Sequence, residues 1–377
     1  MRDEVAELAG WQQQGATFAL ATVVGTSHSA PRPAGSVLAL HPDGRIVGNV
    51  SGGCVEPAVV DIAQQVLADG IPRRARFGYS DAEAFAVGLT CGGEVDVLVR
   101  QVTPDTLPLA PLVTALAEDT AAVLATVVDA PDDAHVGMSV LLTGAGTTGS
   151  LAGTRLGRVI ADECRTAIGR SEVTLRHLGA DGERMRDEAT VLIESFSERP
   201  QMIVFGAIDY AAAVASIGRF LGYRVTVCDA RAAFATRERF PEADEIVVEW
   251  PHRHLERTTL DGRSVVIVLT HDPKFDVPAI VAALRTPARY VGVMGSRRTH
   301  EDRIVRLREA GVDEAGLARL RSPIGLDLGG RTPQETAVSI AAELVMTAHA
   351  TSGRPLRETD GPIHPAPPAD GRPVGRR

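Results

Sequence analysis

Two glycine-rich segments of the chain each place a cysteine close to a glutamate. The first reads Ser51-Gly52-Gly53-Cys54-Val55-Glu56, and the second, at residues 88–94, reads GLTCGGE. Paired glycines adopt backbone conformations closed to other residues, and successive N–H groups in such a turn can hold an anion. A lone cysteine there is usually a small buried side chain, but the second segment favours a functional pair. The candidate site residues are Cys54, Glu56 and Cys91, with Gly52, Gly53, Gly92 and Gly93 as backbone contacts for a ligand.

The segments around the first turn indicate an α/β unit. A helix is expected at residues 3–14, because its apolar residues recur at helical spacing. The apolar runs 18–24, 35–40 and 45–50 predict strands, and residues 57–67 again have helical spacing. Pro57 suits a helix start, so Cys54 and Glu56 lie just ahead of a helix N-terminus, where a thiolate is favoured.

The middle of the chain repeats this layout at an offset of about one hundred residues. The matching pairs are 19–24 with 123–128, 35–40 with 137–142, and 75–78 with 175–179. In the second copy the turn corresponding to Ser51–Glu56 is Ala152–Leu156, which has neither thiol nor carboxylate. The fold therefore does not require Cys54 or Glu56, and the chemistry is assigned to the first copy.

One glycine motif in the second copy has the spacing of a dinucleotide-binding turn. Residues 144–149 read GAGTTG, a G-x-G-x-x-G match after an apolar strand. The repeat places this motif at a strand-to-strand turn, and the residues after it contain two further glycines. We predict a hairpin turn here, with a phosphate site as the alternative.

From residue 200 onward strands alternate with helices, which predicts a parallel, doubly wound sheet. The predicted strands are 202–205, 224–228, 245–248, 264–269 and 290–294, and the predicted helices are 209–221, 277–284 and 334–347. The fold class is therefore α/β, a duplicated unit followed by a Rossmann-like domain. The expected divisions are 1–100, its degenerate repeat 101–199, the Rossmann-like domain 200–350, and a disordered tail rich in proline and glycine at 351–377.

The first turn of the Rossmann-like domain begins at Gly206. Asp229 follows about twenty residues later, where an acid that binds ribose belongs. Ile208 stands where a second glycine would admit a pyrophosphate, and Asp209 adds a negative charge at the helix start. We expect Asp209 to be the helix N-cap, and dinucleotide binding in the usual pose is not favoured.

Ligands of such folds bind at the carboxyl ends of the strands, so the loops there supply further candidates. His271 beside Asp272 is either a general base or part of a capped loop. Ser296 and Arg297 suit phosphate or carboxylate recognition. The loop at residues 322–333 contributes Asp327.

Composition and charge exclude several classes of protein. The net charge is −9, which argues against non-specific binding to nucleic acid or to a membrane surface. The cysteines show no C-x-x-C spacing, so a structural zinc site is not expected. We find no long apolar run, so we expect neither a signal peptide nor a membrane span. A cytoplasmic location with reduced thiols is expected.

Several long blocks resemble the XdhC/CoxI family of xanthine dehydrogenase accessory factors. In the N-terminal part they are ATVVGTSHSAPRPAGS, GRIVGNVSGGCVEPAVV and GLTCGGEVDVLV; in the C-terminal part they are YVGVMGSRRTHEDRIVRL and SPIGLDLGGRTPQETAVSIAAEL. The family's Rossmann turn usually reads G-A-G-H, from which Ile208 and Asp209 depart. The blocks span residues 17–350 in order and are more specific than any short motif.

The resemblance implies a maturation factor for molybdenum hydroxylases such as xanthine dehydrogenase or carbon monoxide dehydrogenase. Such a factor would bind the molybdenum cofactor (molybdopterin) while a cysteine desulfurase supplies its sulfido ligand, and would deliver it to the large subunit of the hydroxylase. Cys54 and Cys91 would then be ligands of molybdenum or sulfur, and a homodimer is expected. The alternative is an NAD(P)-dependent oxidoreductase, with a nucleotide in the Rossmann domain, Asp229 on the ribose and His271 as acid or base.

Overall fold

The structure is a computed structural model, and it describes residues 1–27, 32–78, 93–103, 105–170, 172–183, 186–360 and 363. The chain divides into two compact units, with the boundary between Glu198 and Arg199. The first unit holds both copies of the predicted repeat, and the second holds the Rossmann-like domain.

Each copy of the repeat forms a five-stranded antiparallel sheet. The first copy contains α1 (Val5–Gln13), β1 (Phe18–Ser27), β2 (Val37–Leu40), β3 (Ile46–Gly48), α2 (Glu56–Asp69), β4 (Arg73–Phe77) and β5 (Glu94–Val102). The second contains α3 (Leu109–Ala117), β6 (Ala122–Asp129), a short 3-10 helix (Asp133–His135), β7 (Ser139–Thr143), β8 (Gly146–Thr148), α4 (Arg155–Ala167), β9 (Val173–Leu178) and β10 (Ala189–Phe196). The strand orders are β3-β2-β1-β5-β4 and β8-β7-β6-β10-β9, so the predicted duplication is confirmed.

The duplication extends to single backbone positions. Gly48 and Gly149 follow equivalent hairpins, and both have positive φ, at 81° and 119°. A Cβ atom at these positions would come within 2.2 and 2.4 Å of the carbonyl oxygens of Val37 and Ser139. The chain passes too close to its neighbouring strand for any side chain, so both copies need glycine. The motif at residues 144–149 lies at the β7–β8 hairpin, as predicted.

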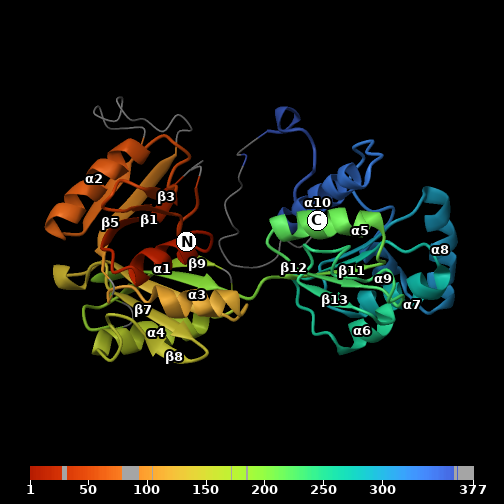
Figure 1. Cartoon of the computed structure of the whole chain (residues 1–377), viewed down its shortest axis with the longest axis horizontal. Helices are drawn as coiled ribbons and strands as arrows, with labels where there is room; N and C mark the ends of the chain where they lie inside the picture. The colour runs from red at the N-terminus through yellow and green to blue at the C-terminus, as the bar shows by residue number, and fades with distance from the viewer. Residues whose placement is uncertain are drawn as a thin grey trace. The chain divides into compact units, whose positions relative to one another are not determined.

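The two sheets share one core. Helix α2 packs on one face of the first sheet through Val59, Ala63 and Val66, and α4 covers the second sheet in the same way (Figure 1). The opposite faces of the sheets meet each other, together with α1 and α3. One small cluster in this seam, the interface between the two sheets, contains Val24 and Leu98 of the first copy with their equivalents Val128 and Leu192 of the second. Because both faces of β1 and β6 are covered, their sequences are continuously apolar.

The second unit is a six-stranded parallel sheet of order β13-β12-β11-β14-β15-β16. Its elements are β11 (Gln201–Phe205), α5 (Asp209–Phe220), β12 (Arg224–Cys228), β13 (Glu245–Val247), α6 (Pro251–Arg257), β14 (Val265–Val268), α7 (Pro273–Arg285), β15 (Tyr290–Val293), α8 (Arg297–Glu309), α9 (Glu314–Arg319), β16 (Leu320–Arg321) and α10 (Pro333–His349). All five predicted strands and all three predicted helices are present. Prediction missed the 13-residue helix α8 and the short elements α6, α9 and β16.

Helices cover both faces of this sheet, which makes it doubly wound (Figure 1). Helices α5 and α10 pack on one face, and α6, α7 and α8 pack on the other. The strand order reverses between β11 and β14, so the loops after these two strands diverge. That divergence opens a crevice at the carboxyl ends of the strands.

The beginning of the predicted tail lies within the described residues. Residues 351–360 include a short 3-10 helix, Leu356–Glu358. The rest of the tail, apart from residue 363, lies outside the described residues. None of the helices in the described ranges has the length and apolar composition needed to cross a bilayer.

Candidate functional site

The Cys54 turn joins β3 to α2 and folds back on itself. Gly52 and Gly53 have φ values of 85° and 114°, which strongly favour glycine. The Ser51 hydroxyl accepts hydrogen bonds from the N–H groups of Cys54 and Val55, at 3.1 and 3.0 Å. Cys54 is half-buried and stands just before the first turn of α2. The turn therefore presents this thiol from a fixed backbone.

Glu56 holds the turn together. Its carboxylate accepts from the N–H groups of Val50, Ser51 and Gly53 at 3.2, 2.9 and 2.9 Å, and from the Ser51 hydroxyl at 2.5 Å. Partial burial raises the pKa of Glu56, but the hydrogen bonds from Ser51 and from the backbone outweigh it and hold the pKa below its usual value. Glu56 is therefore a charged residue directed at its own turn, and its geometry is that of a positioning residue for Cys54.

The second cysteine segment is only partly described. Cys91 and Gly92 lie outside the described residues, so the predicted pairing of Cys54 with Cys91 stays a prediction. Gly93 is buried immediately before β5, and Glu94, the first residue of β5, accepts a hydrogen bond from the Ser27 hydroxyl at 3.2 Å. Cys164 and Cys228 are buried, and burial raises the pKa of both thiols to about 12. Among the described cysteines, Cys54 is the one that is only partly buried, and it packs against the core between α2 and the first sheet.

The equivalent turn of the second copy is built differently. Thr154 caps α4 by accepting a hydrogen bond from the N–H of Gly157 at 2.9 Å. A Cβ atom on Gly157 would lie 1.9 Å from the carbonyl oxygen of Leu151. An ordinary helix cap thus replaces the hydrogen bonds that Glu56 makes in the first copy. That the second copy carries no chemistry stays a prediction.

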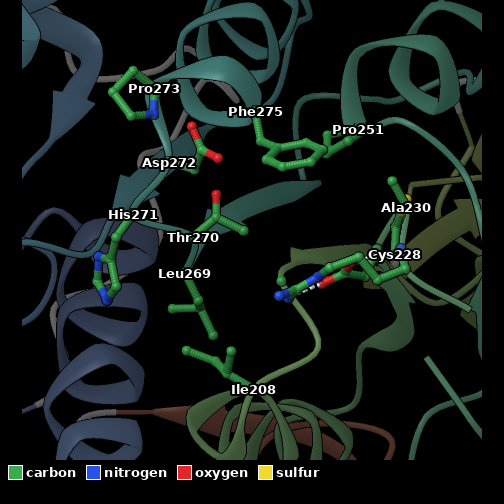
Figure 2. A pocket seen from close by; sticks show the side chains of 13 residues that line it. Ile208, Cys228, Ala230, Pro251, Leu269, Thr270, His271, Asp272, Pro273 and Phe275 are labelled. Atoms are coloured by element: carbon green, nitrogen blue, oxygen red, sulfur yellow. Dashed lines mark hydrogen bonds and ion pairs between the residues drawn. The ribbon is translucent and has the colours of Figure 1, made fainter. Parts of the chain in front are cut away.

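The Rossmann unit contains a cavity of about 500 Å³ at the carboxyl ends of its strands. It brings together three predicted residues, Gly206, Asp229 and His271, and Figure 2 shows it from close by. The walls are mainly apolar. They consist of Ile208, Cys228, Ala230, Pro251, Leu269, Pro273 and Phe275, with Thr270, Asp272 and Arg231 as further polar members.

The glycine turn of this unit directs its N–H groups into the protein. The N–H of Gly206 donates to the carbonyl of Cys228 and that of Ile208 to the carbonyl of Gly206, both at 3.0 Å. The N–H of Ala207 donates to the Asp229 carboxylate at 2.8 Å. A Cβ on Gly206 would approach the Thr270 side chain to 2.8 Å. This glycine therefore serves the packing of two loops.

Asp229 is buried and fully hydrogen-bonded. Besides Ala207, it accepts from the backbone N–H of Arg231 at 2.9 Å and from two groups of the Arg231 guanidinium at 2.9 and 2.8 Å. Burial raises the pKa of Asp229, but the hydrogen bonds from Arg231 and Ala207 outweigh it and hold the pKa low. A carboxylate has about four lone-pair positions, and these four bonds occupy them. The geometry does not favour a ribose-binding role for Asp229.

The remaining candidates lie on other loops of the same strand ends. Ser296 caps α8 by accepting from the N–H of Thr299 at 3.1 Å, and Arg297 beside it is exposed. Asp327 and His271 are exposed as well. The prediction that Asp209 is the N-cap of α5 is wrong. Ile208 occupies that position without a side-chain cap, and Asp209 instead pairs with Arg239 at 3.3 Å.

Two family models match the chain. Residues 11–78 match the model of the XdhC and CoxI family, and residues 202–344 match that of the XdhC Rossmann domain. The chain belongs to the XdhC/CoxI family. The Cys54 turn lies inside the first match and the cavity of the Rossmann unit inside the second, so the resemblance of the sequence blocks is confirmed.

Alignments with relatives cover most of the length of this XdhC/CoxI protein. A Bacillus subtilis (strain 168) protein, named as a probable xanthine dehydrogenase subunit, is 28% identical over 333 residues, 87% of this chain and 92% of the relative. The Escherichia coli (strain K12) molybdenum cofactor insertion chaperone PaoD is 24% identical over 325 residues, 86% of this chain and 81% of the relative. A crystal structure of a xanthine dehydrogenase from Bacillus halodurans aligns with a TM-score of 0.70 at 22% identity, over 93% of this chain and 96% of that one. The last comparison shows the shared fold.

Two residues of the candidate sites were missed by sequence reasoning. Asn49 accepts from the N–H groups of Ser51, at 3.1 Å, and Gly52, and so completes the Cys54 turn. Arg231 enters the cavity two residues after Asp229. The Asp-x-Arg spacing at a strand end was the available signal for Arg231. In the described part of the chain, no three His, Cys, Asp or Glu side chains gather into a group able to hold a metal ion.

Proposed function

We propose that this protein binds the molybdenum cofactor as cargo and assists its sulfuration and its insertion into a hydroxylase of the xanthine dehydrogenase or carbon monoxide dehydrogenase type. The supporting observation is that 86% of the chain aligns with a protein named a molybdenum cofactor insertion chaperone. In this proposal the protein is an accessory factor in the cytoplasm and acts as a homodimer. Its partners are a cysteine desulfurase, which donates the sulfur, and the large subunit of the hydroxylase.

The Cys54 turn is the proposed contact with the molybdenum end of the cargo. The half-buried thiol of Cys54 is a soft ligand for molybdenum or its sulfur, and Cys91 is proposed as the second ligand. Glu56 fixes the turn, so the backbone at Cys54 is already ordered before the cofactor binds. There is open space above the backbone at Gly53, since a Cβ on this residue would meet no atom within 4 Å. Gly52 and Gly53, with Gly92 and Gly93, are the proposed backbone contacts.

Exposed loops of the Rossmann unit carry the other proposed cofactor-binding residues. Ser296 and Arg297 stand at the start of α8, where an anion is favoured by the helix dipole and the arginine fork together. Asp327 lies on the loop before α10. We propose these three for hydrogen bonds to phosphate or pterin groups.

The cofactor content of the purified protein tests the proposal. Wild-type protein from a molybdenum-replete host should carry molybdopterin, measured as its fluorescent oxidation product. Cys54→Ala and Cys91→Ala should lose most of it, while Cys164→Ala, which removes a buried thiol of the second copy, should retain it after correction for thermal stability. Absence of cofactor from the wild type, or unchanged retention in both site variants, would refute the proposal.

A further inference from the structure

We propose that the cavity of the Rossmann unit binds a planar heterocycle that carries a single phosphate group, with Arg231 as the phosphate-binding residue. The ligand is a phosphomonoester rather than a dinucleotide. The site goes beyond the proposed function, and only one of its two ligand sources, the phosphorylated pterin of the cargo, rests on that function.

The glycine turn lacks the features of a diphosphate site. In a dinucleotide-binding turn the backbone N–H groups face the pyrophosphate. Here Gly206, Ala207 and Ile208 donate to acceptors within the protein. The Asp209 side chain, which pairs with Arg239 at 3.3 Å and is 88% exposed, adds a carboxylate at the first position of α5, where a dinucleotide-binding turn favours an anion.

Arg231 supplies the anion-binding group in place of the turn. Its Nε and Nη2 groups donate to Asp229, which holds the guanidinium in one orientation. The guanidinium also lies over the ring of Phe234, 4.5 Å from its centre, so it is fixed on a second side. A guanidinium has five N–H donors, and Asp229 takes two, which leaves donors for one phosphate. Asp229 therefore acts as the positioning residue of Arg231.

The apolar walls suit a flat ring. Figure 2 shows Phe275 and Pro251 together on one side of the cavity and Ile208 and Leu269 on the opposite side, with open space between them. Phe275 is itself supported by Trp250, whose ring stacks on it at 4.8 Å with an interplanar angle of 28°. An aromatic wall with a fixed backing provides a stacking surface at little entropic cost.

Two sources share this chemistry. One is a free purine nucleoside monophosphate. The other is the phosphorylated pterin that the protein is proposed to carry, whose phosphate would then be bound by Arg231 and not by Ser296 and Arg297. Both combine a planar nitrogen heterocycle with one phosphate, and the cavity volume of about 500 Å³ admits either. The experiment distinguishes them.

Calorimetric titration of cofactor-free protein with AMP, GMP, adenosine and NAD⁺ tests whether the ligand is a purine nucleoside monophosphate. A purine monophosphate should bind about tenfold more tightly than adenosine, and NAD⁺ no more tightly than AMP. Arg231→Ala should remove the preference for phosphate, and Ala230→Phe should block binding by filling the cavity. Arg224→Ala, at the opposite end of β12, is the matched control and should leave binding unchanged.

The molybdopterin content of the same variants tests whether the ligand is the phosphorylated pterin. If neither AMP nor GMP binds, but Arg231→Ala loses the cofactor that wild type and Arg224→Ala retain, the site is assigned to the pterin. The proposal is overturned if no monophosphate binds and Arg231→Ala keeps its cofactor, or if NAD⁺ binds much more tightly than AMP and independently of Arg231. If wild type carries no cofactor, the proposed function fails, and AMP and GMP binding alone decides this site.

Discussion

At the scale of single residues, Glu56 shows how a carboxylate beside a cysteine can serve position rather than chemistry. The sequence spacing predicted the turn, its glycines and the helix that follows. It could not predict that the carboxylate faces back to Val50, Ser51 and Gly53, because those hydrogen bonds depend on the dihedral angles that the glycines adopt. The same holds for Asp229, whose position was predicted and whose engagement by Arg231 was not.

Replacing Glu56 with Gln should loosen the Cys54 turn. The amide keeps the shape of the side chain but faces N–H donors with a donor of its own, so we expect a loss of about 1–3 kcal/mol in the free energy of unfolding. Because the folded-state pKa of Glu56 is lowered, its stabilisation is present above the unfolded value and lost as the pH falls through the folded value. Chemical denaturation between pH 3 and 7 should therefore show a smaller acid-dependent loss in Glu56→Gln than in wild type. The exposed Glu7→Gln variant is the control. If the free energy of unfolding depends on pH in the same way in both variants, the proposed stabilisation of the turn by the Glu56 carboxylate is wrong.

Glu194 should make the protein less stable as the pH rises. Its side chain is buried in the seam between the two sheets, and this burial raises its pKa to about 7, while the amino terminus and Arg100 act in the opposite direction. Between the unfolded value and about 7 the folded state binds the extra proton, so the free energy of unfolding falls with rising pH in that window. Glu194→Gln should raise the melting temperature at pH 8 and change it little at pH 5. A variant that is less stable than wild type at pH 8 would show that the charged pair with Arg100 stabilises the seam.

At the scale of elements, sequence periodicity predicted the strands with long apolar runs. It missed elements that form only because they pair with, or pack on, a neighbouring element. The runs in β1 and β6 were predicted because both of their faces are buried. Strand β16 has only two residues, and its pairing with β15 rather than its composition makes it a strand. Helix α6 is seven residues long and includes His252 and His254, so it shows too little apolar periodicity to be recognised.

The loop between β16 and α10 should depend on a buried carboxylate. Glu343 of α10 accepts from the Tyr290 hydroxyl at 2.6 Å and from the N–H of Gly325 at 2.7 Å. Tyr290→Phe removes one of these donors and should cost about 1–3 kcal/mol, because the buried Glu343 loses a partner. Hydrogen exchange at Gly325 and Leu326 should become faster. Tyr223→Phe, whose hydroxyl accepts from Arg289 elsewhere in the same unit, should leave exchange in this loop unchanged; equal acceleration in both variants would refute the local link.

At the scale of the whole molecule, the two copies of the repeat should fold only together. The inner face of the first sheet, with Leu20 and Leu98, is covered by the second copy. Each such leucine contributes about 1.5–3 kcal/mol when buried, so exposing several of them exceeds a typical domain stability of about 5–15 kcal/mol. Residues 1–198 expressed alone should therefore unfold cooperatively on heating, as should residues 199–360, whereas residues 1–103 should not. Circular dichroism melts of the three fragments test this, and a cooperative, monomeric transition of residues 1–103 would show that one copy is a folding unit and that the seam is an interface between two of them.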